Sequence, residues 1–121
     1  NSAENIYQFM HTTIQDLDIE EGWVLMMKQN FRLIEAKRIS VGGLTMAPVD
    51  LRLMMKEVLL KNTTVLAFCH NHPSGSTNPS RDDDILTSHI HKACELLHIH
   101  FADHVILTDG GYFSYREEGK L

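Results

Sequence analysis

Residues 64–83 read TVLAFCHNHPSGSTNPSRDD. The first six are β-branched or apolar and show no polar alternation, a pattern typical of a central strand covered on both faces. Residues 70–79 are rich in Pro, Ser, Gly and Asn, which predicts a loop. Ser80 then opens a helix, whose core face is predicted at Leu86, Ile90, Ala93, Cys94 and Leu97. The stretch therefore predicts a strand, a loop and a helix of an α/β domain.

Strands and helices are interleaved through the rest of the chain. The helical spacing of apolar residues predicts an N-terminal helix at Ile6, Phe9, Met10 and Ile14. Residues 23–27 and 32–40 predict strands, and residues 50–62 predict a helix. Residues 105–107 and 112–115 flank Asp109-Gly110-Gly111, which is a strong hairpin signal. We therefore predict an α/β fold, with a mixed sheet sandwiched by helices and a C-terminal β-hairpin.

Composition sets limits on the class of protein. The 121 residues are 43% hydrophobic and 22% charged, which suits one domain with a real core. The net charge of −5 argues against broad non-specific nucleic-acid binding, but leaves open a local basic patch formed by Lys28, Arg32, Lys37 and Arg38.

The expected setting of the chain follows from its cysteines and its apolar runs. The two cysteines are far apart in apolar surroundings, which favours a reducing, cytoplasmic location over a disulfide framework. No apolar run approaches the roughly 20 residues that cross a bilayer, so no membrane association is expected. The opening Asn1-Ser2-Ala3 lacks a start Met and is compatible with a cloning remnant on an excised domain.

The polar part of the opening stretch predicts a metal site. His70 and His72 are two residues apart at a strand end, so both rings can point to the same side. Asp83 lies in the first helical turn, where the positive end of the helix keeps its carboxylate ionised. Two imidazoles and one carboxylate suit Zn²⁺ and leave a fourth position for water. Zinc would lower the pKa of that water to about 7.

Each part of this pattern has a simpler explanation. Ser80-x-x-Asp83 is also an ordinary N-capping pattern, and two histidines near a strand end are often polar rim residues. The combination of buried strand, His-x-His-Pro, Gly/Pro loop and Ser-x-x-Asp helix start is more specific than its parts. Capping and metal binding are also compatible, because Ser80 can cap the helix while Asp83 faces a metal.

These residues resemble a known family. His70-x-His72-Pro73, six further residues and Ser80-x-x-Asp83 match the JAMM metalloprotease motif. The longer string resembles the RadC group of JAB (MPN+) domains, which carries the label "DNA repair protein". Further similarity is found at residues 31–34, 39–44, 103–107 and 112–119. The resemblance covers residues 17–121 and leaves residues 1–16 as an N-terminal helix.

The resemblance implies a three-layer JAB/MPN fold, similar to that of cytidine deaminases, and a zinc-dependent hydrolase of peptide or isopeptide amides. It also implies an upstream Glu as general base and the motif Ser, here Ser80, as a donor to the water or the oxyanion. Glu20 and Glu21 are the candidates for the base. Glu20 is favoured because relatives carry an aromatic or apolar residue two positions later, although Gly22 departs from that pattern. Both could also be solvated loop carboxylates, and Glu35, within a strand, ranks lower.

The remaining histidines give weaker signals. A second His-x-His at His98 and His100, near Asp103, lacks the Pro/Gly loop and is interpreted as structural or surface-exposed. His104 matches a family position, which favours a role beside the ligands. No His-x-Glu or Pro-Cys-x-x-Cys pair is present, so a deaminase is excluded.

The sequence leaves the function itself open. The alternatives to a hydrolase of peptide or protein substrates are a non-catalytic zinc-binding adaptor, a DNA-repair-associated interaction domain and, less favoured, a metal-dependent nuclease. Nucleic-acid binding and oligomeric state stay open.

Overall fold

The computed structural model describes residues 2–14, 18–42 and 49–121, and contains one five-stranded mixed sheet. The strand order is β2-β1-β3-β4-β5. β1 is antiparallel to both β2 and β3, β3 is parallel to β4, and β4 is antiparallel to β5. The strands are β1 (Glu21–Met27), β2 (Leu33–Val41), β3 (Val65–Asn71), β4 (His100–Thr108) and β5 (Gly111–Ser114).

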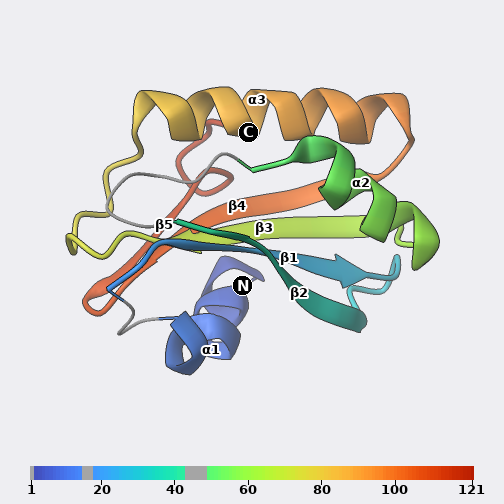
Figure 1. Cartoon of the computed structure of the whole chain (residues 1–121). Coiled ribbons are helices and arrows are strands. Elements are labelled where there is room, and N and C mark those ends of the chain that lie inside the picture. The colour runs from blue at the N-terminus through green and yellow to red at the C-terminus, as the bar shows by residue number, and fades with distance from the viewer. Residues whose placement is uncertain (1, 15–17, 43–48) are drawn as a thin grey trace.

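Helices cover both faces of the sheet, as Figure 1 shows: α1 lies on one face, and α2 and α3 lie on the other. The helices are α1 (Ser2–Ile14), α2 (Leu51–Leu60) and α3 (Arg81–Leu96). This three-layer arrangement and the β4–β5 hairpin confirm the predicted α/β class. None of the described helices is long and apolar enough to cross a membrane.

Strand β3 lies at the centre of the sheet and is buried along its whole length. Its odd-numbered residues, such as Ala67, pack in the core under α1, and its even-numbered residues, such as Phe68, pack in the core under α2 and α3. This double coverage is the reason that the strand shows no polar alternation. His70 continues the even-numbered series, so its ring emerges on the α3 side of the sheet.

Several predicted boundaries were wrong, and two of them bear on the site. β3 continues through His70 to Asn71, where the sequence pattern predicts a loop, because Gly22 of β1 and Ile106 of β4 pair with His70 on either side. β4 begins at His100 rather than at residue 105. Its buried Asp103 and His104 interrupt the apolar pattern that sequence reasoning relies on, and hydrogen bonds to other elements satisfy both side chains.

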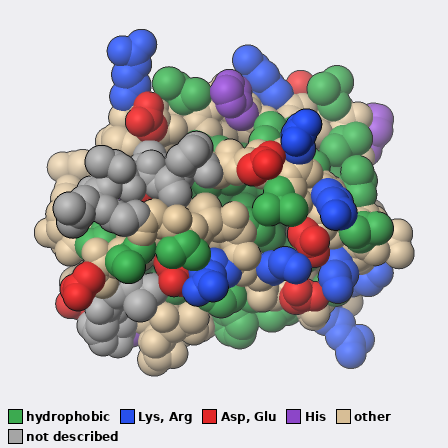
Figure 2. Space-filling model, in the orientation of Figure 1, with side chains coloured by type: hydrophobic (Ala, Val, Ile, Leu, Met, Phe, Trp, Pro, Cys, Tyr) green, Lys and Arg blue, Asp and Glu red, His purple; other side chains and the backbone are tan. Residues whose placement is uncertain are grey.

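Two of the four residues that leave a local basic patch open, Lys37 and Arg38, are partly neutralised. Lys37 forms an ion pair with Glu57 at 3.3 Å, and Arg38 forms one with Glu21 at 3.2 Å. On the side of the molecule that faces the viewer, Figure 2 shows Lys and Arg side chains lying among Asp and Glu side chains. The surface charge is therefore mixed there, whereas phosphate binding favours a uniformly basic area.

Candidate metal centre

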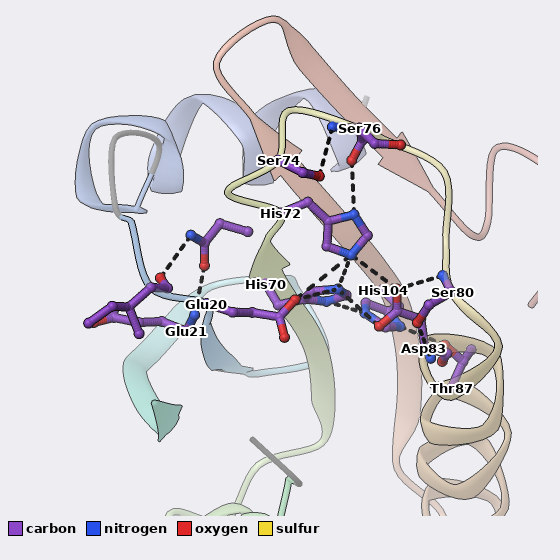
Figure 3. Close-up of polar contacts among 12 residues, drawn as sticks. Glu20, Glu21, His70, His72, Ser74, Ser76, Ser80, Asp83, Thr87 and His104 are labelled. Carbon is purple, nitrogen blue, oxygen red and sulfur yellow. Dashed lines mark hydrogen bonds and ion pairs between the residues drawn. The ribbon is translucent and has the colours of Figure 1, made fainter. Parts of the chain in front are cut away.

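Three elements bring the predicted ligands together at one end of the sheet. His70 lies near the end of β3, and His72 follows that strand directly. Asp83 lies in the first turn of α3, and Glu20 directly precedes β1. Figure 3 shows these four side chains pointing toward a common space. The structure thus joins residues that are more than sixty positions apart in the sequence.

The distances fit a small cation. His70 Nε2 lies 3.0 Å from His72 Nε2, and the Asp83 carboxylate lies 3.2 Å from the first and 3.1 Å from the second of these atoms. Tetrahedral zinc with bonds of about 2.1 Å holds its ligand atoms roughly 3.4 Å apart. A modest outward shift of the side chains would therefore accommodate zinc.

Two sets of ligands share the same pair of histidines. Glu20, His70 and His72 offer ligand atoms within 4.8 Å of one another. Glu20 Oε1, however, lies 3.9 Å from both imidazole nitrogens, so Asp83 is the closer carboxylate. Asp83 Oδ1 is also buried and receives no well-directed hydrogen bond from the described residues. An acceptor in this state fits a cation, so the geometry favours Asp83 as the third ligand.

Asp83 also caps its helix. The Ser80 hydroxyl oxygen accepts a hydrogen bond from the Asp83 N–H at 3.0 Å, and the Ser80 N–H donates to Asp83 Oδ2 at 2.9 Å. Ser80-x-x-Asp83 therefore forms a capping box, and the same Asp83 carboxylate still faces the His70 and His72 rings. Among the described residues the Ser80 O–H donates no hydrogen bond, so its proton is free to point toward a bound group.

Burial and the contacts between the candidate ligands shift the pKa values of Asp83 and His72 in opposite directions. Burial acts to raise the pKa of Asp83, but hydrogen bonds and charge from His70 and His72 outweigh it and hold this pKa well below its usual value. Burial acts to lower the pKa of His72, yet bonds to Asp83 and Ser76 outweigh it and raise this pKa. The site therefore keeps a carboxylate and attracts positive charge.

Glu20 lies beside the candidate ligands and is partly buried. Burial raises its pKa, although the neighbouring His70 and His72 act to lower it. A carboxylate with a raised pKa takes up a proton more readily near neutral pH. The other candidates lie elsewhere: Glu21 contacts Trp23 and Arg38, and Glu35 of β2 pairs with Lys61 at 3.0 Å.

Asn71 holds Glu20 in place, and sequence reasoning missed it. Its carboxamide oxygen accepts the Glu21 N–H at 2.7 Å, and its carboxamide nitrogen donates to the Ile19 carbonyl at 3.1 Å. The side chain is 1% exposed. Its two bonds bracket Glu20 and tie the backbone before β1 to the end of β3. Its position between the two histidines was the only signal in the sequence.

Comparison with known proteins identifies the family. The model of the RadC-like JAB domain matches residues 1–120.

This chain belongs to the RadC family of JAB domains.

A UPF0758 protein of Flavobacterium johnsoniae is 38% identical over 118 residues, which are 98% of this chain and 52% of the relative. Another, of Porphyromonas gingivalis, is 37% identical over 116 residues, 95% of this chain and 51% of the relative. A third, of Histophilus somni, is 34% identical and shares 98% of this chain and 53% of its own length. The chain thus spans about half the length of these relatives, and the match to the family includes α1.

The RadC resemblance led us to expect an aromatic or apolar residue at Gly22, and packing explains the departure. A Cβ atom there would lie 2.5 Å from Ser40 Oγ and 2.9 Å from the Phe68 ring. The Phe68 ring is 1% exposed and lies 5.0 Å, centroid to centroid, from the His104 ring. In this chain Phe68 therefore fills the space that a side chain at position 22 would need.

We expect Gly22→Ala to lower the free energy of unfolding by about 1–3 kcal/mol, because the buried Phe68 ring cannot move away without repacking. Urea unfolding followed by circular dichroism measures the change. Gly110→Ala is the matched control, since nothing lies within 4 Å of its Cβ position, and it should change stability by no more than about 0.5 kcal/mol. Equal stability of the two variants would contradict the packing argument.

The second His-x-His does not join this centre. His98 has a φ of 56° in the turn after α3, and His100 makes an edge contact with Phe31. Asp103 accepts hydrogen bonds from Ser114 and Arg116. Within the described part of the chain, the acidic and histidine residues that could hold a metal gather only around His70 and His72.

Proposed function

We propose that this RadC-like domain is a zinc-dependent hydrolase that cleaves peptide or isopeptide amides in a protein substrate. The convergence of His70, His72 and Asp83, with Glu20 beside them, carries the proposal. Three ligands with a free fourth position are typical of catalytic rather than structural zinc sites. Two buried, unpaired cysteines, Cys69 and Cys94, support a cytoplasmic location.

The residues around the centre supply the remaining chemistry of amide hydrolysis. Zinc, when bound, lowers the pKa of a coordinated water and polarises the substrate carbonyl. Glu20 takes the proton from the attacking water and passes it to the leaving amine, a transfer that its raised pKa favours. The Ser80 O–H donates toward the negative charge that develops on the carbonyl oxygen.

A panel of peptides and isopeptide-linked conjugates tests the proposal. We expect the zinc-loaded chain to cleave at least one amide, the cleavage to stop with a chelator, and added zinc to restore it. Stoichiometric zinc without turnover on any conjugate would favour a non-catalytic adaptor instead. Absence of bound zinc in elemental analysis would exclude both functions.

The raised pKa of His72 predicts that, as the pH falls, the zinc-free chain becomes more stable while its affinity for zinc becomes weaker. Its folded pKa lies above the value of about 6.5 expected in the unfolded state. The zinc-free chain therefore gains stability from protonated His72 below pH 6.5 and loses it as the pH rises through the folded pKa. Zinc requires neutral imidazole, so zinc binding weakens over the same range as the pH falls.

Urea unfolding with chelator and zinc competition titrations, both from pH 5.5 to 8, measure these two trends. His72→Asn should flatten the pH dependence of zinc-free stability, which separates His72 from the other histidines. Zinc binding that strengthens toward acid pH would contradict the assignment of His72 as a ligand.

A further inference from the structure

A chain of buried hydrogen bonds lies behind His70, on the side away from the proposed metal. His70 Nδ1 lies 2.8 Å from His104 Nε2, and His104 Nδ1 lies 2.6 Å from Thr87 Oγ1. The Thr87 hydroxyl donates to the backbone carbonyl of Asp83 at 2.8 Å. His70, Thr87 and His104 are 3%, 4% and 0% exposed. Figure 3 shows that these hydrogen bonds link β3, β4 and α3.

The direction of each hydrogen bond can be assigned by starting from the Asp83 carbonyl, the acceptor at the end of the series. A carbonyl only accepts, so the single proton of the Thr87 hydroxyl points to the Asp83 carbonyl. Thr87 Oγ1 must then accept the Nδ1–H of His104. Both ring nitrogens of the fully buried His104 face Thr87 and His70 rather than a carboxylate, so burial favours the neutral ring, which carries only this one N–H.

The same reasoning fixes the proton on His70. His104 Nε2 has a lone pair and accepts the Nδ1–H of His70. A neutral His70 ring therefore has a lone pair on Nε2, the atom that lies beside Asp83 and His72. His72 also has its lone pair on Nε2, because its Nδ1–H donates directly to the Ser76 carbonyl at 2.8 Å.

The reverse direction would block the site. If Thr87 donated to His104, each bond in the chain would reverse and His70 would carry its proton on Nε2. That proton would occupy the position that a metal needs. In the zinc-free chain that proton would face the Asp83 carboxylate at 3.2 Å, so this direction competes with the one set by the Thr87 bond to the Asp83 carbonyl. The Asp83 carbonyl favours the direction that leaves Nε2 free.

We propose that Thr87 and His104 are positioning residues that hold the proton of His70 on Nδ1 and thereby set the affinity of the centre for zinc. The inference rests on the proposed zinc site but assigns a role to two residues outside the ligand set. Partners that orient a ligating histidine typically change metal affinity by about 10–100-fold when they are removed.

Zinc competition against a chromophoric chelator tests the proposal. Thr87→Val keeps the shape of the side chain but removes both its proton and its acceptor, so we expect zinc affinity to fall about 10–100-fold. Thr87→Ser restores the hydroxyl and should recover affinity to within about threefold of the original chain. Thr63→Val is the matched control: its hydroxyl is buried without a partner among the described residues, near the opposite end of β3, and affinity should stay unchanged.

The proton itself can be observed in the zinc-free chain. Long-range ¹H–¹⁵N spectra of histidine rings distinguish an Nδ1–H ring from an Nε2–H ring. We expect Nδ1–H for His70 in the original chain and Nε2–H in Thr87→Val. A purely structural effect of the substitution would lower affinity without moving this proton.

The outcomes separate this inference from the proposed function. If the original chain binds zinc and Thr87→Val binds it equally well, the inference is overturned and the zinc site stands. An Nε2–H ring on His70 in the original chain would also overturn it. If the original chain binds no zinc, the proposed function fails, while the spectra still decide whether Thr87 and His104 orient His70.

Discussion

We expect Asp83→Ala to weaken zinc binding by more than about 100-fold, a larger effect than loss of an outer hydrogen-bond partner. Among the described residues, Asp83 is the carboxylate that lies closest to the Nε2 atoms of both His70 and His72. Without it, two neutral imidazoles would have to hold the ion alone. Elemental analysis after dialysis and chelator competition measure the loss.

Asp82→Ala is the control for this experiment. Asp82 lies in the same helical turn and has the same charge, but its side chain is exposed, so zinc binding should not change. The experiment also decides between the two ligand sets. If Asp83→Ala binds zinc normally and Glu20→Ala does not, Glu20 is the third ligand and our assignment of the base is wrong.

Glu20→Gln should separate chemistry from binding. We expect kcat/KM on a cleaved substrate from the panel to fall about 10²–10⁴-fold, the usual contribution of a general base. Zinc affinity should stay within about threefold, because the Glu20 carboxylate lies 3.9 Å from the imidazole nitrogens and the carboxamide has the same shape.

Glu21→Gln is the matched control for this second experiment. The Glu21 carboxylate contacts Trp23 and Arg38, so turnover should be retained. Full activity of Glu20→Gln would remove Glu20 from the reaction. Equal losses in the two variants would indicate damage to the start of β1 rather than loss of a base.

The fold was predictable from the sequence because its central elements repeat simple patterns. The apolar run at 64–69, the helical spacing after Ser80 and the Asp-Gly-Gly turn each predict one element, and each is present. The start of β4 was not predictable in this way. Its Asp103 and His104 are polar yet buried, and residues 10 or more positions away satisfy them.

The candidate ligands were predictable for a different reason. His70, His72 and Asp83 lie within fourteen residues of one another, so local geometry is enough to bring them together. Glu20 is fifty positions before His70, and their separation is set by tertiary structure, namely the antiparallel pairing of β1 with β3 and the Asn71 hydrogen bonds. Spacing alone could not choose among Glu20, Glu21 and Glu35.

The role of Thr87 was not predicted from the sequence, because a buried threonine on the inner face of a helix is usually a packing residue. It lies four positions after Asp83 on the same face of α3, and that spacing is a signal that could have been used. His104 could be suspected from the family resemblance, but its contact with His70 depends on β3 and β4 being parallel neighbours.

The carboxamide of Asn71 links the backbone on either side of Glu20 to the end of β3 without passing through the polypeptide that separates them in the sequence. The residues between β1 and β3 include a turn, an edge strand and a helix, yet none of these carries the short link that Asn71 makes across the sheet. Length changes in the turn between β1 and β2 or after α2 can therefore accumulate while Glu20, His70 and His72 keep their relative positions.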